Sequence, residues 1–372
     1  MRVSCERARL IEKVSFCLGA VASKSTIAAL EGILIKTGEG NITLTGYDLE
    51  LGIRTTLEAE VGEAGGIVLG GRMFLDILRS LPDEIVNIDV NEKNAASITS
   101  GKSVFTIIGI PAEDFPELQR IEAEKSFSLP QGLLKDMVSS TLFSVSTNEN
   151  KPIQTGCLFD IADGFLNVVA VDGFRLALRR EAFGSIGDIG ELNFVVPGAA
   201  LKQVERILED NDEQAELVLS RKHMGFSIGD TYLVTRLLEG EFINYKNVIP
   251  KETPIEIKVG VKTLLSSVER VALIVNERLK NPVRLIMGYD VIRMSCATAS
   301  GQSYDECPAV GNGNDLEIGF NSRYVAEALK AVGDEEIVLK MTNALSPCLI
   351  YPTEGDSFLY LVLPVRLRAG DV

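Results

Sequence analysis

The chain has 372 residues, of which 46% are hydrophobic and 24% are charged, and its formal charge at pH 7 is −15. This balance is typical of folded globular proteins, excludes disordered, collagen-like and coiled-coil classes, and predicts roughly two to four domains. The single histidine, His223, excludes metal sites with several histidine ligands.

Six segments have apolar residues at helical spacing, which predicts six amphipathic helices. The first, for example, carries Leu10, Val14 and Cys17 on one face. The predicted helices cover residues 6–18, 72–80, 130–146, 198–209, 260–272 and 321–332. Their starts are 58 to 68 residues apart, so the chain contains a repeated unit.

Short β-branched runs bounded by Gly, Asn or Asp fill the intervals between these helices and predict strands. They cover residues 33–36, 41–45, 52–59, 85–90, 104–108, 166–170, 175–179, 216–220, 233–237, 254–259, 292–296 and 337–341. Each repeated unit is therefore one helix with about four short strands, which is an α+β pattern.

The chain also repeats at a longer interval than that between successive helices. Similar sequence motifs begin at Gly71, Pro197 and Asn321, which are 126 and 124 residues apart. An acidic and aromatic phrase at Glu113–Leu118 recurs at Glu239–Tyr245. We expect three similar domains, each with two helices and antiparallel sheets, over residues 1–124, 125–252 and 253–372.

Charge is distributed unevenly between the predicted elements. The six helical segments contain twelve basic and eight acidic residues, a net charge of +4, so the rest of the chain carries −19. Ordinary solvated helix faces explain such a count. Alternatively, all six helices face one mildly basic surface, which would hold nucleic acid weakly and without sequence preference.

Motifs for catalysis or cofactor binding are absent. The chain has no phosphate-binding loop, no dinucleotide fingerprint and no nucleophile elbow. His223 lies in a polar stretch that predicts a solvated turn, and Asp163, Asp172 and Asp188 stand near glycines as turn formers. We therefore predict no enzyme activity and no cofactor.

The six cysteines have no metal-binding or redox spacing. They are Cys5, Cys17, Cys157, Cys296, Cys307 and Cys348, and no two form a C-x-x-C pair. We expect no metal site and reduced thiols that pack as small hydrophobic side chains. The N-terminus lacks an apolar signal segment and the longest apolar run, Phe358–Val365, is strand-sized, so we expect a cytoplasmic protein without membrane contact.

Five short sequence motifs, taken in chain order, resemble those of the bacterial DNA polymerase III beta subunit, the sliding clamp family. The resemblance extends over nearly the whole chain. Five segments carry the resemblance: Leu44–Glu50, Asp114–Leu118, Val169–Ala177, Gly319–Asn321 and Leu363–Leu367. Each motif alone is weak evidence for the family, but the order and positions of the five motifs over three repeats are specific to it.

The resemblance implies two chains that close head-to-tail into a ring, with the helices lining a hole around double-stranded DNA. The DNA would be held by topology and without sequence recognition. The implied partners are the DNA polymerase III alpha subunit, the clamp loader, and other polymerases and repair proteins that dock short hydrophobic peptides. A hydrolase using two carboxylates and an acidic scaffold unrelated to DNA stay open as alternatives.

The resemblance also implies a peptide pocket between the second and third domains. Its residues would be Gly173, Arg175, Leu176, Val248, Val362, Leu363, Pro364, Val365, Arg366 and Leu367. Without the resemblance, the apolar members would be assigned to the core. Phe174, Ile243, Asn247 and Pro347 depart from the family's usual residues, and Arg368–Val372 extend past Leu367.

Two further sets of residues follow from the resemblance and from helix phase. Phe105, Ile107, Leu273 and Ile274 align with the family's ring interface, although packing within a domain would also account for them. The predicted DNA-facing residues are Lys24, Arg72, Arg79, Lys135, Lys202 and Arg206.

Overall fold

The computed structural model describes residues 1–118, 121–182, 190–276 and 281–367. Within them all six predicted helices are confirmed, and each begins within one residue of the expected position. They are α1 (Arg7–Leu18), α2 (Gly71–Ser80), α3 (Gln131–Leu142), α4 (Gly198–Ile207), α5 (Val261–Ala272) and α6 (Ser322–Lys330).

The prediction that the third helix extends to residue 146 is wrong, because α3 ends at Leu142. The hydroxyl groups of Ser140 and Thr141 donate to the carbonyl oxygens of Asp136 and Met137, at 2.6 and 2.9 Å. Such side-chain bonds compete with the helical pattern. Two residues past the helix end, the amide of Ser144 donates to the carbonyl oxygen of Thr141 and forms a turn.

The chain packs into two compact units, Met1–Lys135 with Ala199–Leu237, and Asp136–Gly198 with Leu238–Val372. The division falls inside α3 and at the start of α4, so strands of the predicted middle domain belong to both units. All strand pairs between described residues are antiparallel, as predicted.

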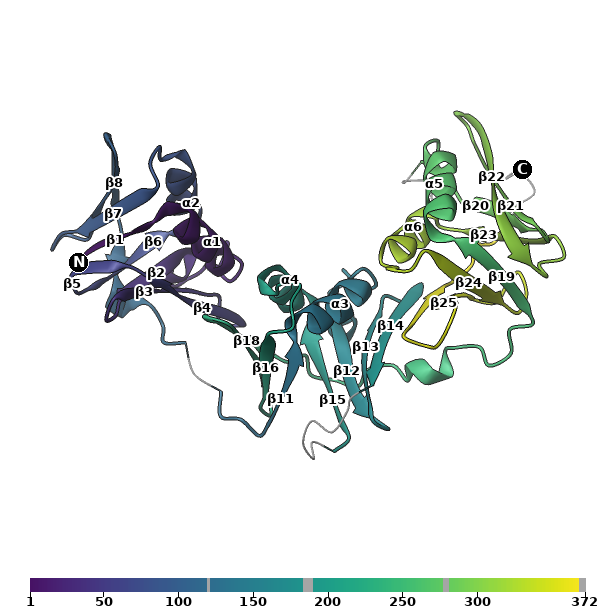
Figure 1. Cartoon of the computed structure of the whole chain (residues 1–372), viewed down its shortest axis with the longest axis horizontal. Helices are drawn as coiled ribbons and strands as arrows, with labels where there is room; N and C mark the ends of the chain where they lie inside the picture. Colours follow the sequence, from purple (N-terminus) through teal and green to yellow (C-terminus); the bar gives the residue numbers. More distant parts are fainter. Residues whose placement is uncertain (119–120, 183–189, 277–280, 368–372) are drawn as a thin grey trace. The chain divides into compact units, whose positions relative to one another are not determined.

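The first unit contains two sheets (Figure 1). The five-stranded sheet runs in the order β5 (Glu60–Glu63), β1 (Arg2–Glu6), β7 (Ile85–Val90), β8 (Ala95–Ser100) and β9 (Ser103–Ile108). The nine-stranded sheet runs β10 (Ile110–Pro111), β6 (Gly66–Gly70), β2 (Gly32–Thr37), β3 (Asn41–Tyr47), β4 (Leu51–Glu58), β18 (Thr231–Arg236), β17 (His223–Ile228), β16 (Gln214–Leu219) and β11 (Lys125–Pro130).

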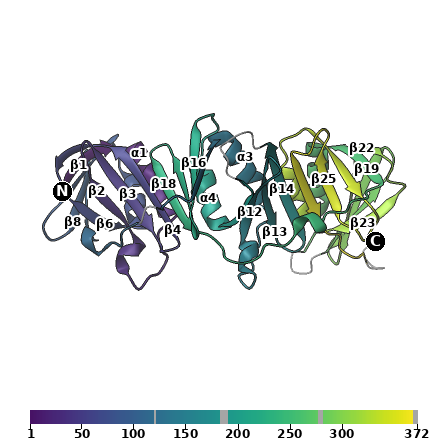
Figure 2. The same cartoon turned by 90° about the horizontal axis from the view of Figure 1, so that it is seen from below.

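The second unit contains a twelve-stranded sheet, of which Figure 2 shows β12, β13, β14 and β25. Its order is β15 (Leu192–Pro197), β12 (Gly156–Ala162), β13 (Phe165–Val171), β14 (Arg175–Ala182), β26 (Phe358–Val362), β25 (Cys348–Pro352), β24 (Glu336–Met341), β19 (Ile255–Gly260), β22 (Gly301–Gly311), β21 (Val291–Thr298), β20 (Val283–Met287) and β23 (Leu316–Phe320).

Helices cover one face of these sheets through the apolar stripes seen in the sequence. In the first unit α1 packs on α2 and on β3 and β4 (Figure 1). The side chains of Leu10, Val14 and Phe74 are fully buried. In the second unit α5 packs on α6, β21 and β22, with Leu264 and Val268 in the core. Burial of each such side chain stabilises the fold by about 1.5–3 kcal/mol.

The cysteines are free and buried, as predicted. Burial raises the pKa of Cys17, Cys157 and Cys348 to about 12, so these thiols are neutral at pH 7. Among the described residues no group of three His, Cys, Asp or Glu side chains is placed to hold a metal ion. None of the described helices is long and apolar enough to cross a membrane.

His223 is exposed, as predicted, but its placement in a turn is wrong because it begins β17. Its backbone carbonyl accepts the amide hydrogen of Ser220, so Arg221 and Lys222 form the tip of the β16–β17 hairpin. Of the predicted turn-forming acids, Asp163 adopts a left-handed conformation before Gly164 in the β12–β13 turn. Asp188 lies outside the described residues.

Candidate functional site

The turn between β13 and β14 is fixed by the side chain of Asp172. Its Oδ1 accepts the backbone amide hydrogens of Phe174 and Arg175, at 2.8 and 3.1 Å. Between them Gly173 has a φ of +93°, a conformation that glycine adopts without steric cost. The Asp-Gly pair therefore ends one strand and starts the next, as the sequence predicts.

Arg175 begins β14 and is only 7% exposed. Its Nε donates to Asp172 Oδ2 at 2.9 Å, and Nη1 pairs with Glu327 of α6. The guanidinium carbon lies 4.5 Å from the ring centre of Tyr324 and 5.5 Å from that of Phe143. Arg175, which the resemblance assigns to the peptide pocket, is thus held inside the second unit.

The partners of Arg175 on α6 and after α3 were missed by sequence reasoning, since they are far away in the chain. Burial disfavours ionisation of Glu327, but hydrogen bonds and charge from Arg323 and Arg175 outweigh it and lower its pKa. The carboxylate stays ionised and neutralises the buried guanidinium. This cluster ties α6 to the β13–β14 turn.

Leu176 and Leu363 lie on one face of adjacent strands, whereas Val362 faces the opposite way, into the core that contains Leu264 of α5 and Val325 of α6. Arg175 pairs with Val362 and Leu176 with Leu361 in the β14–β26 ladder, and Leu176 is 1% exposed. The amide of Leu363 donates to the carbonyl of Phe174 at 2.9 Å. Leu176 belongs to a core cluster against which Leu363 packs, so these two predicted residues share an apolar floor.

Val248 follows the short helix η4 (Tyr245–Asn247) and is 37% exposed. In the same segment Tyr245 is buried and donates to Asp160 Oδ2 at 2.7 Å, which fixes the segment on the outer face of β12 and β13. Burial and the neighbouring Asp160 raise the pKa of Tyr245, so its hydroxyl stays protonated. Sequence reasoning missed this anchor.

A hollow of about 410 Å³ opens on this face beside Leu178, Tyr245, Ile249 and Leu359. Leu178 lies two residues after Leu176 on β14 and therefore on the same face of the sheet. The hollow and the predicted apolar floor follow the same strands. Phe174, at 58% exposed, stacks on Tyr324 with ring centres 6.2 Å apart.

The last predicted pocket residues, from Pro364 onward, leave β14 and run beside β23. Val365 donates to the carbonyl of Gly319 in β23 at 2.8 Å, and the side chain of Leu367 covers Gly319. Pro364 is half-buried and Arg366 is exposed. Among the departures noted in the sequence, Ile243 and Asn247 are exposed and Pro347 is half-buried, while the extension 368–372 lies outside the described residues.

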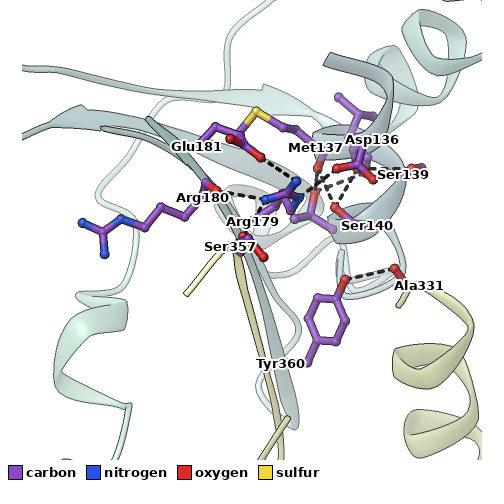
Figure 3. A network of polar contacts seen from close by, with 12 residues as sticks. Asp136, Met137, Ser139, Ser140, Arg179, Arg180, Glu181, Ala331, Ser357 and Tyr360 are labelled. Carbon is purple, nitrogen blue, oxygen red and sulfur yellow. Dashed lines mark hydrogen bonds and ion pairs between the residues drawn. The ribbon is translucent and has the colours of Figure 1, made fainter. Parts of the chain in front are cut away.

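A second polar network stands at the other end of β14 (Figure 3). The Arg179 guanidinium lies between Asp136 of α3, at 2.8 Å, and Glu181, at 2.6 Å. It also donates to the carbonyl of Ser357 at 2.8 Å, and Tyr360 donates to the carbonyl of Ala331 after α6 at 3.2 Å. These contacts join α3, β14 and the strand β26.

Comparison with known proteins identifies the family to which this chain belongs. Models of the DNA polymerase III beta subunit match residues 1–119 (N-terminal domain), 128–244 (central domain) and 246–366 (C-terminal domain). The beta sliding clamp of Halalkalibacterium halodurans is 34% identical over 98% of this chain and 100% of its own length. This chain belongs to the DNA polymerase III beta subunit family.

Other relatives and solved structures agree with that assignment. The beta sliding clamp of Staphylococcus aureus is 30% identical over 98% of this chain and 99% of its length. The crystal structure of the Bacillus subtilis sliding clamp has a TM-score of 0.91 at 31% identity, covering 99% of this chain and 100% of that one. The Pseudomonas aeruginosa clamp bound to griselimycin has a TM-score of 0.91 at 26% identity, with the same coverage. The sliding-clamp fold and function expected from the sequence are therefore confirmed.

In this beta-subunit chain the predicted interface residues lie at two places. Phe105 is 37% exposed and Ile107 half-buried on β9, and Leu273, just after α5, is 84% exposed. Ile274 is half-buried and packs against the core of the second unit. Leu273 and the residues of β9 are therefore the ones available to another chain.

The predicted DNA-facing residues of this family member are at the surface. Lys24, Arg72, Arg79, Lys202 and Arg206 are exposed, and Lys135 is half-buried. Arg72 and Arg79 stand seven residues apart on α2, and Lys202 and Arg206 four apart on α4, so each pair shares a helix face. Within the described part of the chain none of the six forms an ion pair with a carboxylate.

Proposed function

We propose that two copies of this chain close head-to-tail into a ring around double-stranded DNA and tether polymerases to it. The observation that carries the ring is a pair of strand edges with free backbone groups. Among the described residues, β9 pairs with β8 alone, and residues Gly301–Pro308 of β22 pair with β21 alone. Open edges are templates for pairing with another chain.

Exposed apolar side chains accompany both edges. Val104 and Ile108 on β9 are 64% and 75% exposed, and Leu273 is 84% exposed near β22. Isolated surface residues of this kind are normal, but their concentration along an unpaired edge favours a protein interface. One chain's β9 would pair with the partner's β22, with Phe105, Ile107, Leu273 and Ile274 at the contact. Such a contact between two different surfaces closes into a ring when its rotation permits.

DNA would be held by topology, with Lys24, Arg72, Arg79, Lys135, Lys202 and Arg206 meeting its phosphates. These cations are spread over loops and helices and need no base contact, so the ring can slide without sequence preference. A surplus of acidic side chains on the strands and loops would repel DNA from the other face. The protein would act in the cytoplasm, by holding its partners in place rather than by catalysis.

The partner pocket would be the apolar floor of Leu176 and Leu363 with Val248 beside it. A leucine or phenylalanine side chain of a partner peptide would fill this space, and Gly173 leaves room for its backbone. The partners would be the DNA polymerase III alpha subunit, the clamp loader, and other polymerases and repair proteins. Val362, Pro364, Val365, Arg366 and Leu367 would frame the site. Arg175 would position the turn through its ion pairs.

We also propose the domain boundaries 1–124, 125–252 and 253–372. Support for them comes from the repeated phrases in the sequence and from the repeated order of one helix followed by several antiparallel strands.

Loading onto nicked circular DNA tests the ring. The clamp should stay on the circle through gel filtration at a salt concentration that strips linear DNA, and should leave when a restriction enzyme linearises the circle. Sedimentation should give a dimer mass, and Leu273→Asp should give monomers that no longer stay on the circle. A wild-type protein that remains monomeric, or stays bound after linearisation, would contradict the proposal.

A further inference from the structure

The first unit repeats the turn geometry of the proposed peptide pocket. In the β3–β4 turn, Asp48 Oδ1 accepts the amide hydrogens of Glu50 and Leu51, at 2.9 and 2.7 Å. Leu49, between them, has a φ of +81°, close to the +93° of Gly173. Asp48, Leu49 and Leu51 therefore stand where Asp172, Gly173 and Arg175 stand in the second unit.

The strand that pairs with the residues after each turn does so in the same register in both units. Leu51 pairs with Thr235 in the β4–β18 ladder as Arg175 pairs with Val362 in the β14–β26 ladder. The following amide, that of Arg236, donates to the carbonyl of Glu50 at 3.0 Å, as Leu363 does to Phe174 at 2.9 Å. The two junctions share one backbone framework.

A segment of chain crosses the sheet face beside each framework. Leu118 lies so close to Gly52 that a Cβ atom on that glycine would be 2.1 Å from Leu118 Cδ1. Ile121 lies six residues after Phe115, as Val248 lies six residues after Phe242. Ile121 also contacts the sheet at Gly225, where a Cβ would be 3.2 Å from its Cδ1.

Here the first unit has a hollow of about 490 Å³, and part of its lining is apolar. The apolar and aromatic lining residues are Tyr47, Leu49, Leu118, Ile121 and Val234. Leu49 is 52% exposed although it carries a large side chain in a conformation that such residues rarely adopt. Strained residues of this kind are concentrated at ligand-binding and switch sites.

The rim of this hollow holds the only run of three basic or histidine residues in the chain, Arg221, Lys222 and His223. All three are exposed, and within the described residues the side chains of Arg221 and Lys222 form no ion pair. Glu50, Glu122 and Glu124 also line the hollow, and Glu50 lies 3.8 Å from Arg236. The two cations are thus available to a ligand carboxylate.

From this repetition we infer a second peptide site on the first unit, over Leu49, Ile121 and the Arg221–Lys222 tip of the β16–β17 hairpin. It accepts a short segment with a large apolar side chain beside a carboxylate. The apolar group lies on Leu49 and Ile121, and the carboxylate pairs with Arg221 or Lys222. The inference rests on the proposed function, because it assigns to this site the occupant proposed for the Leu176 pocket.

Calorimetric titration with a decapeptide of glycine and serine ending in Asp-Leu-Phe, with a free carboxyl terminus, tests the inference. The full-length protein should bind two peptides per chain. Ile121→Asp and Val248→Asp are matched variants at equivalent positions, and each should reduce the stoichiometry to one. The double variant Arg221→Glu, Lys222→Glu changes exposed residues and should weaken the first-unit site by roughly tenfold.

The outcomes separate the two sites. One peptide per chain, lost in Val248→Asp and unchanged in Ile121→Asp and in the charge-reversed variant, would overturn the second site and leave the proposed function intact. Binding that survives Val248→Asp but is lost in Ile121→Asp would support the second site and contradict the Leu176 pocket. No binding, or binding that none of the variants changes, would contradict both. Thermal melting of each variant identifies misfolding, and Ile121→Ser replaces Ile121→Asp if that variant does not fold.

Discussion

The β3–β4 and β13–β14 turns share a backbone and differ in nearly every side chain. Both are closed by an aspartate that accepts two amide hydrogens, and both contain a residue with positive φ. The first turn places Leu49 and Leu51 where the second has Gly173 and Arg175. The first junction is therefore apolar and strained, while the second is charged and unstrained.

This difference teaches that a repeated framework does not fix what a site binds. The aspartate and the ladder are enough to set the course of the backbone. Leu176 supplies the floor of the second site, whereas Gly52 at the same position leaves its space to Leu118 of the crossing segment. The chemistry of each junction thus comes from a few side chains on one scaffold.

The largest expected effect is the loss of the buried cation. Arg175→Ala should lower the free energy of unfolding by about 3–5 kcal/mol, because the partly buried carboxylates of Asp172 and Glu327 would lose their shared partner and the buried space beside Tyr324 and Phe143 would be left empty. Leu51→Ala, at the equivalent position, should lower it by about 2–3 kcal/mol through lost apolar burial. Urea denaturation of the two variants compares the junctions directly. Equal effects would mean that the ion cluster adds nothing to the second junction.

Next comes the anchor of the crossing segment. Tyr245→Phe should cost about 1.5–3 kcal/mol, since its hydroxyl donates to the Asp160 carboxylate. The equivalent crossing segment in the first unit is held by Leu118, so Leu118→Ala tests apolar packing alone. Hydrogen exchange of the amides of Lys246–Val248 should quicken in Tyr245→Phe. Unchanged exchange would show that apolar contacts are sufficient to hold this segment.

Exchanging the positive-φ residues should have opposite signs in the two turns. Gly173→Leu should destabilise by about 1–2 kcal/mol, because it places a side chain in a left-handed conformation and in the room left for a partner backbone. Leu49→Gly should relieve the same strain and stabilise by up to about 1 kcal/mol. Thermal melting measures both. If Gly173→Leu were stabilising, or Leu49→Gly strongly destabilising, the two turns would not be equivalent.

The smallest effect concerns pH. The pKa of Glu327 is lower in the folded protein than in the unfolded chain, so its stabilising contribution is present above the unfolded value, roughly 4.5, and is lost as the pH falls. Glu327→Gln should flatten the decline of the urea midpoint between pH 6 and pH 4. The first junction has Leu51 in place of Arg175, and Leu51→Ala should leave the slope of that decline unchanged.

The repeated elements of this fold are predictable because their signals are local. Apolar side chains at helical spacing predicted the starts of all six helices to within one residue. The ends of α4 and α6 were predicted two residues too late, and that of α3 four residues too late, where Ser140 and Thr141 bond to the backbone. Strands with weak patterns, such as β1 and β5, were missed, since their pairing partners lie elsewhere in the chain. The Asp172-Gly173 turn was predictable because both residues act within four positions.

By itself the sequence determined the repeat, the helices, the reduced cysteines and the family, since each depends on residue order along one segment. Only the tertiary structure decided what Arg175 does, because Glu327 and Tyr324 are about 150 positions away in the chain. It also decided that the hollow beside Leu49 exists. Charge pairing and burial depend on which residues are neighbours in space. These neighbours are known only once the pairing of the strands is known, and residue order along the chain does not give that pairing.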